Sequence, residues 1–200
     1  DVNKPDKNGA TPLLFASQER HKDIVELLLN MKNIDVNKPG ENGTTPLLIA
    51  SEKGHKDIVE LLLNMKNIDV NKPDKEGVTP LSIASYKGHN DVVELLLNAK
   101  NIDVNIATNT EATPLYFASE KGHKDIVELL LNMKNIDVNK PEKNGVTPLL
   151  FASQEGHKDI VELLLNMNNI DVNKPEKNEV TPLYIASENG HKDIGLNTKT

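Results

Sequence analysis

One three-residue motif recurs at a fixed interval along the whole chain of 200 residues. Thr-Pro-Leu begins at six positions, each 34 residues after the last, and a histidine follows each threonine after ten residues. Such a period predicts a stack of similar units, because each short unit must bury its apolar face against its neighbours. The six threonines are Thr11, Thr45, Thr79, Thr113, Thr147 and Thr181.

Each repeat is predicted to fold into two short helices, as its second copy shows. Thr45 can cap the free N–H groups of a first helix, and Pro46 suits the first helical position. Gly54 permits the left-handed backbone that ends this helix. A second helix is expected to begin near His55, and its run at 58–63 is too widely apolar for one neighbour to cover. We therefore expect each helix pair to pack against the pairs on both sides.

The segments that join successive helix pairs are polar. Residues 67–77 are rich in the turn-forming residues Asn, Asp, Pro and Gly, which predicts a projecting loop. Asn-Gly pairs begin at Asn8, Asn42 and Asn144, and this dipeptide tolerates the positive φ of a tight hairpin.

Over essentially its whole length, the sequence resembles the ankyrin repeat family. The matching strings are Gly-Thr-Thr-Pro-Leu-Leu-Ile-Ala-Ser at 43–51, Gly-His-Lys-Asp-Ile-Val-Glu-Leu-Leu-Leu at 54–63 and Asp-Val-Asn at 69–71. The resemblance implies a mainly α fold, an ankyrin-repeat solenoid of stacked antiparallel helix pairs with protruding β-hairpin-like loops. We expect a single domain over residues 1–200, with the last repeat truncated after Ile194. The near-identity of the units resembles the large duplicated ankyrin families of protozoa and intracellular bacteria, although consensus construction stays open.

Three repeats depart from the pattern at positions that favour glycine. Arg20 replaces the glycine after the first helix, and Glu111 and Glu179 replace the hairpin glycine. A side chain in left-handed backbone costs about 1–2 kcal/mol, so we expect strained or differently shaped turns there.

Composition excludes several classes of function. The formal net charge of −7 disfavours binding to nucleic acid. The absence of cysteine excludes thiolate zinc sites and thiol nucleophiles, and is compatible with a reducing compartment. No stretch approaches the ~20 apolar residues of a membrane span. We therefore expect an intracellular, cytoplasmic monomer with no membrane insertion.

The six histidines in register are interpreted as structural residues at the turn into each second helix. Stacked helices lie ~8–10 Å apart, whereas a zinc–nitrogen bond is only ~2 Å long. Equivalent histidines therefore cannot share an ion. The Asp and Glu that follow each histidine are expected on a solvated helix face, where nothing desolvates them as a catalytic acid or base requires. We predict no metal, no cofactor and no enzymatic activity.

Specificity can arise only where near-identical repeats differ, which is mainly at the hairpin tips and the outer positions of the first helices. The resemblance places these positions on the concave surface of the solenoid. We predict an adaptor or scaffold that binds a partner protein there; a structural spacer or elastic scaffold is the alternative. The third and fourth repeats depart most from the others and combine aromatic with less charged positions, a chemistry typical of interface hot spots. The candidate binding residues are Val78, Tyr86, Lys87, Ile106, Asn109, Thr110, Glu120 and Lys121.

Overall fold

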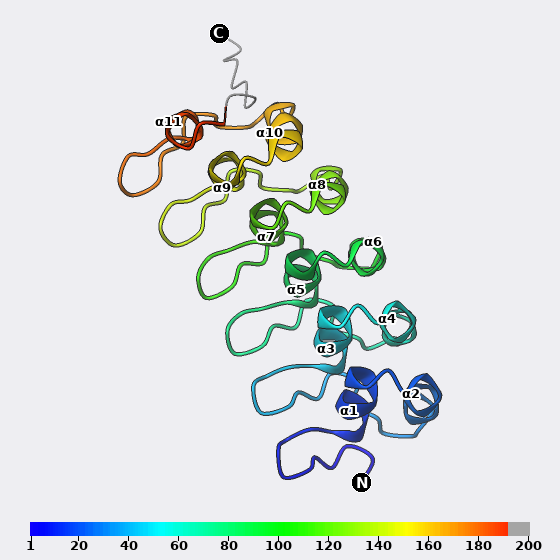
Figure 1. The fold of residues 1–200 in the computed structure, drawn as a ribbon. Coiled ribbons are helices and arrows are strands. Elements are labelled where there is room, and N and C mark those ends of the chain that lie inside the picture. The colour runs from blue at the N-terminus through cyan, green and yellow to red at the C-terminus, as the bar shows by residue number, and fades with distance from the viewer. Residues whose placement is uncertain (192–200) are drawn as a thin grey trace. The chain divides into compact units, whose positions relative to one another are not determined.

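The computed structural model describes residues 1–191, and this part of the chain forms eleven α-helices and no strand (Figure 1). The predicted truncation after Ile194 lies outside the described residues. The first helices of the repeats are α1 (Pro12–Gln18), α3 (Pro46–Glu52), α5 (Pro80–Lys87), α7 (Pro114–Glu120), α9 (Pro148–Glu155) and α11 (Pro182–Glu188). The second helices are α2 (Lys22–Leu29), α4 (Lys56–Leu63), α6 (Asn90–Leu97), α8 (Lys124–Leu131) and α10 (Lys158–Leu165).

Threonine begins each first helix, as the sequence predicted. The Oγ1 of Thr45 accepts a hydrogen bond from the N–H of Leu48 at 3.1 Å, and Pro46 follows the cap. Thr79 makes a fuller cap, because its own N–H donates to Oγ of Ser82 at 2.8 Å while its Oγ1 accepts from the Ser82 N–H. Thr45 is 2% exposed. The cap is therefore part of the core, where an unsatisfied N–H would be costly.

The second helices supply the most deeply buried side chains. In α4, which follows His55 at the N-cap position, Ile58, Val59 and Leu62 are fully buried. This burial agrees with the wide apolar stripe of the sequence, since neighbouring helix pairs cover it. The predicted mainly α fold of stacked helix pairs is confirmed.

Left-handed backbone occurs where the repeat pattern requires it. Gly54 has φ of 68°, as expected for the residue that ends a first helix. Arg20, Glu111 and Glu179 hold the same region without glycine, with φ values of 57°, 65° and 65°. These turns thus have the same backbone shape as in the other repeats. The expected cost of about 1–2 kcal/mol for a residue with a Cβ in left-handed backbone therefore applies at these positions.

Contacts along the chain divide it into two compact units, residues 1–103 and residues 104–200. In the first unit, α3 packs against α1 and α5, and α4 packs against α2 and α6. In the second unit, α9 packs against α7 and α11, and α8 packs against α10. Each unit is thus a stack of helix pairs in chain order, and the single domain expected from the sequence stays a prediction.

In five of the loops an asparagine joins the loop to the next repeat. The Nδ2 group of Asn37 donates to the carbonyl of Asn67 at 2.7 Å, and its Oδ1 accepts from the Asp69 N–H at 2.9 Å. Lys72 then donates from Nζ to the Asn37 carbonyl at 3.0 Å. Hydrogen bonds from these side chains therefore connect successive loops. The other asparagines that make this pair of bonds are Asn3, Asn71, Asn105 and Asn139.

Candidate protein-binding surface

In each unit the hairpin loops project from the side of the first helices that faces away from the second helices (Figure 1). We call the loop tips, together with the exposed ends of the first helices, the hairpin face. It contains most of the positions at which the repeats differ. Almost all of these side chains are exposed or half-buried, and Ala112, 2% exposed, is the exception.

An acidic side chain organises the base of most hairpins. Oδ1 of Asp74 accepts from the N–H groups of Glu76 and Val78 at 2.9 and 2.8 Å. Glu142 does the same from the longer side chain, at 2.8 Å to the Asn144 N–H and 3.3 Å to the Val146 N–H. Successive hairpins also join through their backbones: the Lys75 N–H donates to the Asn42 carbonyl at 3.0 Å. These hairpins are therefore held by hydrogen bonds within the chain.

Three of the candidate residues belong to the first unit. Tyr86 is half-buried near the end of α5, and Nζ of Lys87 lies 5.7 Å from the centre of its ring. Val78 is half-buried beside the cap that begins the same helix. The fold thus brings Tyr86 and Lys87 together and places Val78 at the opposite end of α5, so these residues do not form one compact cluster.

The other five candidates belong to the second unit. Asn109 and Thr110 are exposed at the hairpin tip, where Oγ1 of Thr110 lies 2.8 Å from that of Thr108. Glu120 and Lys121 form an ion pair with each other, 3.3 Å between Oε1 and Nζ, at the end of α7. Ile106 is half-buried and stands where other repeats carry the lysine that donates to the preceding loop. An isoleucine has no such donor, so this loop offers apolar surface instead.

Each first helix also carries a Phe or Ile at its middle, a set of apolar side chains that is not among the predicted site residues. Their exposure differs: Phe15 is 53% exposed whereas Ile49 is 8% exposed. The recurring Phe-or-Ile position itself could have indicated them. The six members are Phe15, Ile49, Ile83, Phe117, Phe151 and Ile185.

Two members of this set, Phe117 and Phe151, contact an aromatic neighbour. The ring of Tyr116 contacts Phe117 and Phe151 edge to face, with centroids 5.8 and 5.5 Å apart. Burial raises the pKa of the Tyr116 phenol well above its ordinary value, and the negative charges of Glu120 and Glu142 add to the rise. Tyr116 therefore stays neutral and acts as an aromatic surface rather than as an acid or a base.

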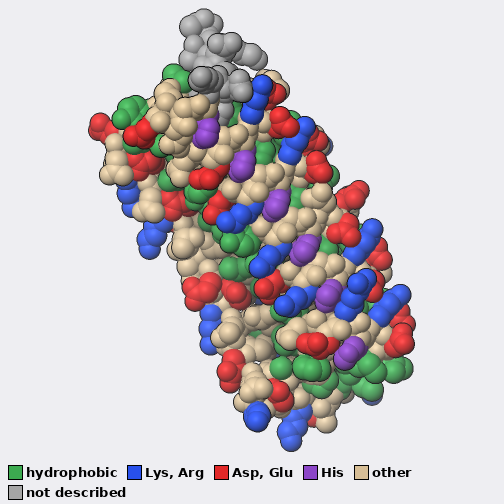
Figure 2. Space-filling model, viewed as in Figure 1, with side chains coloured by type: hydrophobic (Ala, Val, Ile, Leu, Met, Phe, Trp, Pro, Cys, Tyr) green, Lys and Arg blue, Asp and Glu red, His purple; other side chains and the backbone are tan. Residues whose placement is uncertain are grey.

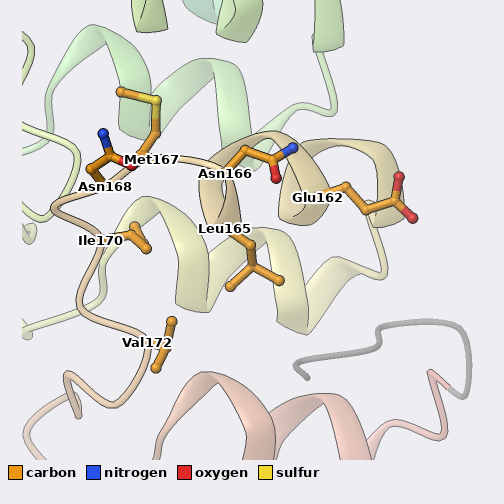
Figure 3. Close-up of a pocket in the computed structure, with 7 residues that line it drawn as sticks. All are labelled: Glu162, Leu165, Asn166, Met167, Asn168, Ile170 and Val172. Carbon is orange, nitrogen blue, oxygen red and sulfur yellow. The ribbon is translucent and has the colours of Figure 1, made fainter. Parts of the chain in front are cut away.

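One pocket lies away from the hairpin face, at the end of α10 (Figure 3). It has a volume of about 610 Å³ and is lined by Leu165, Met167, Ile170 and Val172 with one carboxylate, Glu162, and two asparagine amides. A single carboxylate supplies no acid and base pair. None of the predicted site residues lines this pocket.

The histidines serve as links between repeats. Nε2 of His55 lies 3.1 Å from the Gln18 carbonyl, and Nε2 of His89 lies 2.9 Å from the Glu52 carbonyl of the preceding repeat. The second unit repeats this bond through His157. Figure 2 shows the imidazoles at the surface, one in each repeat. Their structural role agrees with the sequence interpretation, although the sequence did not predict the partner carbonyls.

Comparison with known protein families agrees with this architecture. A family model described as ankyrin repeats (3 copies) matches residues 1–74, 68–142 and 133–195. The chain therefore belongs to the ankyrin repeat family, a non-catalytic fold whose members are generally protein–protein interaction modules. None of the curated proteins compared with the chain matches it. No helix in the described part of the chain has the length and apolar character needed to span a bilayer.

Proposed function

We propose that this chain is an adaptor or scaffold module that binds a partner protein through its hairpin face. One observation carries the proposal. Among the positions shared by the repeats, the histidines and loop asparagines are hydrogen-bonded between repeats, whereas the loop-tip and helix-end positions that differ are nearly all exposed or half-buried. Stability of the stack explains the shared positions, so the differing ones are available for recognition.

The predicted residues define two contact regions within that face. The first holds Tyr86 and Lys87, a half-buried aromatic ring with a cation above it. The second holds Ile106, Asn109 and Thr110, a loop with no charged side chain among them. Aromatic and weakly charged surface of this kind favours a protein partner. We propose further that the module acts as a monomer in the cytoplasm, with which its lack of cysteine is compatible.

A random-peptide display library selected on the immobilised chain tests the proposal. We expect peptides that bind saturably and lose about tenfold or more in affinity to Tyr86→Ala or Ile106→Lys, the usual effect of truncating or charging a hot spot. Ile106→Lys gives the loop the residue found at the same position of the other repeats, so the fold is preserved. Circular dichroism checks that both variants are folded.

Glu94→Ala, an exposed change on α6 in the same repeat as Tyr86, is the matched control and should leave binding unchanged. Selected peptides that depend on Glu94 but not on the hairpin face would contradict the proposal. If no peptide binds saturably, and if scrambling the residues at the differing positions changes no measured property of the chain, the chain is a spacer.

A further inference from the structure

The hairpin of the second repeat differs from all the others in where it carries its acidic residue. The other repeats read Pro-Asp-Lys, Pro-Glu-Lys or, once, Ala-Thr-Asn, whereas this one reads Pro39-Gly40-Glu41. In this hairpin the carboxylate lies at the tip, at Glu41, and Gly40 occupies the base position at which most other hairpins carry an acidic residue. Elsewhere the base carboxylate accepts N–H groups of its own loop.

At this position the Glu41 carboxylate does not accept the N–H groups of its own loop. Its side chain is exposed and makes no hydrogen bond or ion pair with the described residues. Its aliphatic part lies over the backbone of Gly9 in the preceding hairpin. A Cβ added at Gly9 would lie only 2.5 Å from Cγ of Glu41. Glu41 thus lies at the boundary of two hairpins.

Glu41 lines a pocket between the first two hairpins and helices α1 and α3. The pocket has a volume of about 360 Å³, the size of a site for one or two side chains rather than for a large ligand. Phe15, 53% exposed, and Ile49 provide an apolar wall. Asp6 adds a second carboxylate, and the lining includes no basic side chain. The pocket therefore combines negative charge with apolar surface.

We infer that this pocket binds an arginine side chain of a partner protein. The planar guanidinium can form a bidentate pair with the Glu41 carboxylate. Its face can lie against the Phe15 ring, which attracts cations, while the aliphatic stem covers Ile49. Lysine matches this combination less well because a compact ammonium lacks the planar face. The inference rests on the proposed function and specifies the partner chemistry of one part of the hairpin face.

The chain supplies a matched variant for the test. Gly40→Asp with Glu41→Lys gives the second hairpin the Pro-Asp-Lys sequence of the third. A Cβ at position 40 meets Cδ1 of Leu14 at 3.7 Å, an ordinary contact, and the hairpin closes on Thr44 as the third closes on Val78. The double variant should fold as the parent does and reverses the charge at position 41, while the carboxylate introduced at position 40 should accept N–H groups of its own loop, as that of Asp74 does. Glu41→Gln removes the charge without changing the shape.

The probe is N-acetyl-arginine methylamide, titrated into the isotope-labelled chain and followed by amide NMR shifts. We expect saturable shifts around Gly40, Glu41 and Phe15 with a Kd of about 1–10 mM. Affinity should fall about fivefold in Glu41→Gln and about tenfold or more in the double variant. It should weaken further at high salt, which screens the pair. The citrulline analogue, neutral and of the same shape, should not bind there, and the lysine analogue should bind more weakly than arginine.

Equal shifts with arginine and citrulline, or shifts spread evenly over all hairpins, would overturn the inference. Unchanged binding to the double variant would do the same. The proposed function is tested separately. If peptides bind the hairpin face but their affinity does not depend on Glu41, only the arginine pocket is contradicted. If no peptide binds that face, both the pocket and the proposed function are contradicted.

Discussion

At the scale of single residues, the hairpin glutamate Glu111 occupies backbone that glycine would occupy without strain. Its φ is 65°, the same region as Gly77 and Gly145 in other hairpins. We expect Glu111→Gly to raise the free energy of unfolding by about 1 kcal/mol, because the clash of Cβ with the backbone disappears. Urea unfolding followed by circular dichroism measures this change.

Glu111→Ala separates backbone strain from charge, since alanine keeps Cβ and removes the carboxylate. It should change stability by less than about 0.5 kcal/mol. A gain equal to that of the glycine variant would show that charge, and not the backbone, is responsible. Arg20→Gly should gain less than Glu111→Gly, because it also loses the exposed pair with Asp57 at 3.1 Å.

The Tyr116 phenol gives the protein a pH dependence of known sign. Its folded pKa lies above the ordinary value of about 10, mainly through burial. The folded state therefore holds this proton more tightly than the unfolded state, and stability is lost as the pH rises above about 10. Tyr116→Phe cannot ionise, so its stability should fall less over the same range. Urea unfolding of both proteins at several alkaline pH values provides the comparison, and a constant difference between them would contradict the expectation.

At the scale of elements, the loop asparagines predict how firmly neighbouring repeats are joined. Asn37→Ala removes the bonds to Asn67 and Asp69 and leaves a carbonyl and an N–H without their partner. We expect a loss of about 1–3 kcal/mol in the free energy of unfolding. Asn42→Ala, at the exposed tip of the same loop, is the control and should cost less than about 0.5 kcal/mol. Equal losses would mean that the asparagine bonds contribute nothing particular to the stack.

At the scale of the whole molecule, one octapeptide recurs in different surroundings. Lys-Asp-Ile-Val-Glu-Leu-Leu-Leu forms α2, α4, α8 and α10. In α2, Ile24 is 47% and Leu27 is 61% exposed, whereas Ile58 in α4 is fully buried. The same sequence is therefore packed less completely in α2 than in α4.

We expect backbone amides of α2 to exchange with deuterium about tenfold or more faster than those of α4, since less apolar burial opposes local opening. Intrinsic exchange rates are nearly the same, because the helices have the same sequence. NMR-detected exchange in the intact chain measures the ratio. Equal protection would show that the chain opens as one cooperative body.

The sequence by itself determined the helices, their caps and their left-handed ends. These features depend on residues within about one repeat: Thr45 caps the helix that begins at Pro46, and Gly54 ends it. The resemblance to ankyrin repeats rested on the same local pattern, which the family model matches independently. The candidate residues on the hairpin face could be selected by difference between repeats, and they stay predictions.

Only the tertiary structure decided which atoms meet across repeats. His55 reaches the Gln18 carbonyl and Asn37 reaches Asn67, partners 37 and 30 positions away. Nothing in the local pattern names them, because their proximity depends on how helix pairs pack. The same holds for Glu41, whose charge is evident in the sequence but whose place over Gly9 and beside Phe15 is not. The local sequence pattern determines where each helix begins and ends, whereas the packing of helix pairs determines which residues of other repeats it contacts.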